Sequence, residues 1–147
     1  MQTQYGRPTA AACIRGDENH NGLSGSILFT PCKEGTMITV QIYGLPESET
    51  GFFALHIHEG PNCCGTGFPN TRSHYNPCNR QHPDHAGDLP PLLSCNGKAH
   101  MEVLTDRFCI REILGRTILI HSGPDDFTTQ PAGGAGNKIA CGVIRSI

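Results

Sequence analysis

Short runs of β-favouring residues, each closed by Gly, Pro or Asn, constrain this chain more than any other feature. No segment of the 147 residues keeps a helical periodicity, and glycine (18) and proline (11) are frequent. In "MITVQIYGL" the residues Ile38, Val40 and Ile42 share one face, as in a strand with one face in water. The pattern predicts an all-β sandwich or barrel. The expected strands lie at residues 9–16, 23–30, 35–45, 52–58, 98–105, 116–122 and 138–147, and residues 105–115 predict either a helical turn or a further short strand.

Length and charge exclude several classes of protein. The chain is long enough for one domain, 1–147, and it has no internal repeat. A formal net charge of −2 argues against nucleic-acid binding. No apolar run approaches the roughly 20 residues that cross a membrane. The start, "MQTQYGRPTAAACIRGDEN", lacks the apolar core of a signal peptide. We therefore expect a cytoplasmic protein if this is the full chain, or a secreted or periplasmic one if a signal has been removed.

Two long segments lack strand patterning. The first runs from Glu59 to about Pro91 and the second from Ser122 to Asn137. Loops longer than about 12–15 residues are uncommon in compact domains and are usually functional or disordered. The first segment is rich in His and Cys, so it is the place to look for chemistry.

Histidine spacing predicts metal binding. His56 and His58 lie on the same side of a strand, so both imidazoles can reach one ion, although such a pair also occurs on a polar strand face. The first loop adds three histidines and a carboxylate, a set that suits tetrahedral zinc, whereas a merely solvated loop leaves so many histidines unexplained. That set is His74, His82, His85 and Asp88.

A second set of four imidazoles overlaps the first. His121 ends an apolar run beside the second loop. Four nitrogens from His56, His58, His74 and His121 suit tetragonal Cu(II). If His74 belongs to both sets, its ring bridges two metals. His20, in the polar turn "DENHNG", is expected to be a solvated surface residue, and His100 an exposed strand histidine.

Five motifs in order, "HIHEG", "HYNP", "HAGDL", "GRTILIHSGPDD" and "GAGNKIACGVI", resemble the copper/zinc superoxide dismutases. The resemblance covers nearly the whole chain, and the spacings His74–His82, His85–Asp88 and His121–Asp125 match the family. It implies an eight-stranded Greek-key β-barrel with two long functional loops. It also implies an enzyme that converts superoxide to O2 and H2O2 by alternating reduction and reoxidation of a copper ion next to a structural zinc. Family members are often dimers, so a homodimer is one option, and the sequence leaves the oligomeric state open.

The resemblance assigns roles to residues. Copper would be held by His56, His58, His74 and His121, and zinc by His74, His82, His85 and Asp88. His74 would also carry a proton to the departing peroxide. Asp125 would hydrogen-bond one copper histidine and one zinc histidine. The family's disulfide corresponds to Cys63 and Cys141, with Cys64 as a rival for Cys63.

The remaining cysteines carry no repeated CxxC pattern, which argues against a four-thiolate zinc site. Cys78 and Cys64 could form an extra disulfide. The others are expected to pack as small apolar residues: Cys13, Cys32, Cys95 and Cys109.

The chain departs from the family pattern at two points. Lys138 stands where many members have an arginine that guides superoxide, so attraction of the anion should survive and its positioning should loosen. His82 and His85 are only three residues apart, whereas many members have a longer insertion there. Three alternatives stay open: a non-catalytic copper/zinc-binding protein, a dismutase that uses copper alone, and a structural or interaction module.

Overall fold

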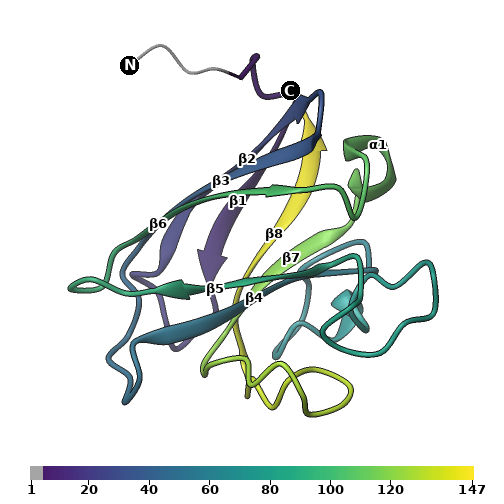
Figure 1. The fold of residues 1–147 in the computed structure, drawn as a ribbon. Coiled ribbons are helices and arrows are strands. Elements are labelled where there is room, and N and C mark those ends of the chain that lie inside the picture. The colour runs from purple at the N-terminus through teal and green to yellow at the C-terminus, as the bar shows by residue number, and fades with distance from the viewer. Residues whose placement is uncertain (1–4) are drawn as a thin grey trace.

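The computed structural model describes residues 5–147, so the first four residues of the predicted domain lie outside it. One eight-stranded antiparallel sheet curls into a nearly closed barrel (Figure 1). The elements are β1 (Ala10–Gly16), β2 (Ser24–Cys32), β3 (Gly35–Tyr43), β4 (Phe52–His58), η1 (Pro69–Thr71), β5 (Asp88–Leu93), β6 (Ala99–Thr105), α1 (Ile110–Ile113), β7 (Thr117–His121) and β8 (Lys138–Ser146). The all-β prediction and all seven expected strands are confirmed.

The strand order confirms the predicted barrel. The order is β5-β4-β7-β8-β1-β2-β3-β6, and the two end strands, β5 and β6, contact each other without a hydrogen-bonded ladder. Across that gap the strands run 3-6-5-4 around the barrel, which is the Greek-key pattern. The order also places β4 beside β7, so strands that lie far apart in the sequence are hydrogen-bonded neighbours.

β4 differs from the other long strands because both of its faces are buried. Phe53, Leu55 and Ile57 point into the main hydrophobic core, as alternation in a strand requires. The alternate residues His56 and His58 face the other way, yet they are buried as well. The long loops cover that outer face, and they therefore bury the histidine pair.

The two loops gather on one side of the barrel, against the end of β4 (Figure 1). The first loop is anchored beside β4 by backbone hydrogen bonds, from Glu59 N to Ser73 O (2.9 Å) and from Tyr75 N to Ile57 O (2.8 Å). A disulfide between Cys63 and Cys141 joins the same loop to β8. Within the described residues, no helix is both long and apolar enough to cross a membrane.

One loop boundary differs from the sequence prediction, and one open alternative is decided. The first loop was expected to run to about Pro91, but β5 begins at Asp88. This prediction was wrong because Pro90 and Pro91 argue against a strand, whereas β5 lies at the end of the hydrogen-bonded order, where a strand tolerates proline. Between β6 and β7 the structure forms the helical turn α1, one of the two predicted alternatives.

The free cysteines also correct the prediction. Cys13, Cys95 and Cys109 are exposed and Cys32 is half-buried, so they do not pack in the core. Cys13 alternates with the buried residues on either side of it in β1 and therefore faces outward. The proposed extra disulfide is wrong as well, since the two cysteines it would join, Cys64 and Cys78, are both free and exposed.

Candidate metal centre

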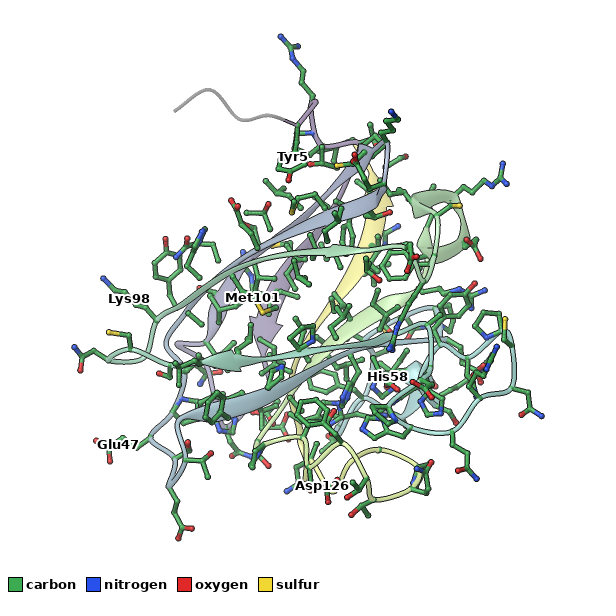
Figure 2. All side chains as sticks on the ribbon, in the orientation of Figure 1. Tyr5, Glu47, His58, Lys98, Met101 and Asp126 are labelled. Carbon is green, nitrogen blue, oxygen red and sulfur yellow. A yellow bond between two sulfur atoms is a disulfide. The ribbon has the colours of Figure 1, made fainter. Side chains whose placement is uncertain are left out.

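Six of the eight histidines converge under the two loops, and all six are buried. They are His56, His58, His74, His82, His85 and His121. Figure 2 shows His58 and Asp126 on the side of the barrel where the loops gather. The other two histidines lie elsewhere: His100 is exposed on β6, as predicted, while His20 is half-buried and bonded to Asp17 at 2.6 Å rather than fully solvated.

A first cluster forms where β4 and β7 meet the first loop. His56, His58, His74 and His121 each offer a nitrogen, and these atoms all lie within 4.8 Å of one another. His58 Nε2 is 3.4 Å from His121 Nε2, and the rings of His56 and His74 lie 4.1 Å apart between centroids. The structure therefore brings together the four residues that the sequence predicted for copper.

The ring nitrogens on the far side of this cluster are held by the protein. His56 Nε2 donates to Asp125 Oδ2 (2.8 Å), and His58 Nδ1 donates to the carbonyl oxygen of Arg72 (2.8 Å). His121 Nδ1 faces the carbonyl oxygen of Gly136 at 3.5 Å. These contacts fix each ring and leave His56 Nδ1, His58 Nε2 and His121 Nε2 directed at the common centre.

A second cluster lies on the other side of the His74 ring. His74 Nδ1 lies 3.2 Å from His85 Nδ1 and 2.8 Å from Asp88 Oδ1. Asp88 Oδ2 lies 3.1 Å from His85 Nδ1 and 3.0 Å from His82 Nδ1, although the latter pair lacks hydrogen-bond geometry. Three imidazoles and one carboxylate oxygen are the donor set of a closed zinc site.

His56 also lies within 4.8 Å of His74, His82 and Asp88. Its Nε2, however, is already bonded to Asp125, whereas His85 Nδ1 is close to both His74 and Asp88. Direct distances between donor atoms therefore favour His85 as the fourth member of the second cluster.

Unpaired buried nitrogens show that the donor sets fit metal ions. His56 Nδ1, His74 Nε2 and His82 Nδ1 are buried and have no hydrogen-bond partner in the described part of the chain. Buried polar atoms are almost always paired, because leaving one unpaired costs about 1–3 kcal/mol. The unpaired atoms are the ones that face the two centres, so each is free to bind a metal ion.

Asp125 connects the clusters from behind. Its two carboxylate oxygens accept hydrogen bonds from His56 Nε2 (2.8 Å) and His82 Nε2 (2.7 Å). The loop must approach closely here: a Cβ atom on Gly133, where φ is +73°, would lie 2.1 Å from Asp125 Oδ1. A residue without a side chain is therefore required at that position.

Burial keeps three histidines of the first cluster, His56, His58 and His121, uncharged. Desolvation, with nearby histidines adding to it, lowers the pKa of His56 to about 2. Desolvation likewise lowers the pKa of His58 to about 2 and that of His121 to about 4. For Asp88, burial by itself would raise the pKa, but the hydrogen bond from His74 and the neighbouring histidines lower it below its usual value. Neutral imidazoles and an ionised carboxylate are the forms that bind metals.

A cavity of about 560 Å³ opens onto the first cluster. His58, His74 and His121 contribute to its wall, together with Arg72 and Lys138. Lys138 Nζ donates to Thr71 Oγ1 (2.7 Å), and desolvation lowers the pKa of this lysine. A small anion can therefore reach the histidines along a wall that carries positive charge.

Sequence reasoning missed two residues that hold the second cluster in place. The Gln130 side chain makes two hydrogen bonds to the backbone of His82, at 2.9 and 2.7 Å. Arg107 Nη1 donates to the carbonyl oxygens of Pro83 (2.7 Å) and His85 (3.1 Å). Both are polar residues that act on backbone atoms distant in sequence, and no sequence motif marks that role.

Comparison with known proteins identifies relatives of this chain. The sequence model described as "Copper/zinc superoxide dismutase (SODC)" matches residues 23–144. A superoxide dismutase [Cu-Zn] of Deinococcus radiodurans is 32% identical, with 97% of this chain and 87% of that protein covered. One from Legionella pneumophila is 36% identical, with 82% and 77% covered.

Solved structures agree with these relatives. A SOD-like protein from Bacillus subtilis superposes with a TM-score of 0.77 at 26% identity, covering 90% of this chain and 96% of that one. A double mutant of a SOD-like protein from the same organism gives a TM-score of 0.76 at 27% identity. The fold, the two histidine clusters and the sequence match together show that the chain belongs to the copper/zinc superoxide dismutase family.

Proposed function

We propose that this protein is a superoxide dismutase, converting superoxide to O2 and H2O2, with copper held by the first cluster and zinc by the second. The observation that carries the proposal is the His74 ring, which offers Nε2 to the first cluster and Nδ1 to the second. The copper ligands would be His56, His58, His74 and His121, and the zinc ligands His74, His82, His85 and Asp88. When bound, copper supplies one-electron redox chemistry toward superoxide and zinc supplies a fixed positive charge.

His74 is the proposed carrier of the proton. Its Nε2 is buried without a hydrogen-bond partner among the described residues, and the residue lines the cavity that opens to solvent. A proton held at Nε2 can pass to a departing peroxide in that cavity, while Nδ1 keeps the ring oriented toward the second cluster. The ring therefore returns to the same position after each turnover.

Other residues orient the histidines and attract the substrate. Asp125 holds His56 and His82 through their far nitrogens, so one carboxylate fixes the orientation of both clusters. Lys138 places a positive charge on the cavity wall, where it attracts the anionic substrate. A lysine lacks the planar fork of arginine, so by itself it positions an anion less tightly.

The test is to load the protein with copper and zinc, count both metals per chain and measure the decay of superoxide. We expect one copper, one zinc and a rate far above that of equal free metals. A rate equal to that of the metal-free protein would refute the proposal.

The same experiment separates the alternatives. An enzyme that uses copper alone would keep its activity with the second cluster empty, whereas a non-catalytic metal-binding protein would hold both metals without activity. The complete donor set around Asp88 supports a zinc-binding second cluster over the copper-only alternative.

Assembly and compartment stay predictions. The resemblance leaves a homodimer open, and sedimentation of the metal-loaded protein would test it. The Cys63–Cys141 disulfide favours an oxidising compartment, outside the cell or in a periplasm, over the cytoplasm. Fractionation of the native host would decide between these two predictions.

A further inference from the structure

Arg72 lies on the wall of the cavity that leads to the first cluster. It shares that wall with His58, His121 and Lys138. The proposed mechanism uses only its carbonyl oxygen, which accepts the hydrogen bond from His58. Its side chain has no role in that mechanism, although it is a permanent positive charge beside the path of an anionic substrate.

The backbone at Arg72 is in a conformation that side chains disfavour. Its φ is +60° and its ψ is −148°, a region occupied mainly by glycine. The neighbouring residues hold it there, since Gly60 N donates to Thr71 O (2.9 Å) and Glu59 N to Ser73 O (2.9 Å). A glycine would relieve this strain, so an arginine here points to a use for its side chain.

The guanidinium of Arg72 is available to a ligand. The residue is exposed, and among residues 5–147 its side chain has no hydrogen-bond or ion-pair partner. Other arginines in this region are engaged: Arg107 bonds to the backbone of the first loop, and Arg116 lies 4.3 Å from the centre of the Tyr75 ring. Arg72 alone of these three leaves its whole donor fork toward solvent.

The second cation on the wall is more constrained. Lys138 Nζ donates to Thr71 Oγ1 (2.7 Å) and lies 3.4 Å from the Arg72 carbonyl oxygen. Glu59 also lines the cavity and offsets one positive charge. Without Arg72, the charged side chains on this wall, Lys138 and Glu59, would sum to zero.

We propose that Arg72 is an anion-guiding residue, which draws superoxide into the cavity and supplies the planar two-donor group that Lys138 lacks. The proposal rests on the proposed function. It assigns the guidance of the substrate to two residues of the same cavity wall: Lys138, which is bonded to the Thr71 hydroxyl, and Arg72, whose side chain is free within the described part of the chain.

The experiment compares Arg72→Gly, Arg72→Gln and Arg72→Lys with Arg80→Gln, each loaded with copper and zinc. Arg80 is an exposed arginine of the same loop that lies outside this cavity, so its variant controls for net charge. We expect the rate constant for superoxide decay per bound copper to fall roughly three- to fivefold in the Gly and Gln variants, the size expected for one unit charge acting across several ångströms of water. The Lys variant should stay within about twofold of the parent and the Arg80 variant should match it.

Azide gives an independent readout of anion binding. Its dissociation constant, followed by absorption of the copper-loaded protein, should rise by a similar factor in the Gly and Gln variants and lose part of its salt dependence. Arg72→Gly should unfold at the same or a higher temperature than the parent, because it removes the backbone strain. Unchanged rates and unchanged azide affinity in both variants would overturn the inference. A parent protein that binds azide through Arg72 but does not consume superoxide would refute the proposed function alone.

Discussion

The two clusters share one ring but are built in different ways. The first takes His56 and His58 from β4 and His121 from β7, two strands that are hydrogen-bonded neighbours in the barrel. The second takes three histidines from one loop and Asp88 from the first residue of an edge strand. Folding of the sheet therefore sets the first cluster, the proposed copper side, whereas closure of a loop sets the second cluster, the proposed zinc side.

The contacts that hold the two clusters in place also differ between strand and loop. His56 and His58 lie in β4, which is buried on both faces, and a protein group holds one ring nitrogen of each. The zinc side depends on Gln130, Arg107 and the Cys63–Cys141 disulfide to hold its loop. Changes to the loop should therefore weaken zinc binding before copper binding.

The largest expected effect comes from the residue that belongs to both sides. His74→Ala removes the proposed proton carrier and one donor from each cluster, so dismutation should fall about 10²- to 10⁴-fold, the usual contribution of general acid–base catalysis. His85→Ala should cost zinc but spare copper, and His100→Ala, on the surface, should change neither. Metal analysis and superoxide decay on the three variants check this; equal damage from His74→Ala and His85→Ala would contradict it.

Removing the disulfide frees the loop that carries the proposed zinc ligands from its covalent link to β8. The bond closes a loop of 78 residues, so Cys63→Ser should lower the free energy of unfolding by about 4 kcal/mol in the chain-entropy model. Urea denaturation of the oxidised proteins measures this, with the exposed free Cys95→Ser as control. A cost below about 1 kcal/mol, or a loss of copper before zinc, would show that the loop is held by other contacts.

Asp125 is hydrogen-bonded to one histidine of each cluster, so a single variant tests both clusters. Asp125→Ala should weaken metal binding about 10- to 100-fold, the usual effect of removing the partner of a ligand histidine. Zinc should suffer more than copper, because His82 lies in a loop and His56 lies in a strand. Competition with a chelator gives both affinities, and equal losses would contradict the division between strand and loop.

Acid should affect the metal-free protein first through the copper side. The folded pKa values of His56, His58 and His121 lie at about 2, 2 and 4, below the 6.5 of an unfolded histidine. Below pH 6.5 the unfolded chain binds more protons, so the free energy of unfolding should fall as the pH falls, by up to about 1.4 kcal/mol per pH unit for each histidine.

The zinc-side carboxylate behaves differently. The pKa of Asp88 is lowered below 3.8, so its contribution is present above that pH and is lost only as the pH falls through the folded value. Urea denaturation at pH 7.5 and 5.0 separates the two effects. An equal free energy of unfolding at both values would show that the copper-side histidines are not held neutral.

The smallest expected effect is at the cavity wall. Lys138→Arg restores a planar fork at this position and should raise the rate of dismutation by about twofold, with no change in metal content. Stopped-flow measurement of superoxide decay checks this against the parent protein. A fall in rate would mean that the hydrogen bond from Lys138 to Thr71 matters more than the shape of the cation.

The sequence was sufficient for the parts that local patterns encode. The alternation of Ile38, Val40 and Ile42 predicts a strand, and the spacing of the histidines predicts their grouping, because ligands of one ion must meet. Contacts between distant segments were not predictable. Pro90 and Pro91 argue against a strand, and the strand forms only because it lies at the end of the sheet. No local pattern indicates that Gln130 bonds to His82. Arg72 is similar, since its strained backbone becomes evident only in three dimensions.

The central claim is that one imidazole, that of His74, joins the two metal sites. A crystal structure of the copper- and zinc-loaded protein, with anomalous diffraction recorded on both sides of each metal's absorption edge, tests it most directly. The account predicts copper beside His74 Nε2 and zinc beside His74 Nδ1. Density for either metal away from this ring, or a His74 that contacts neither, would contradict it.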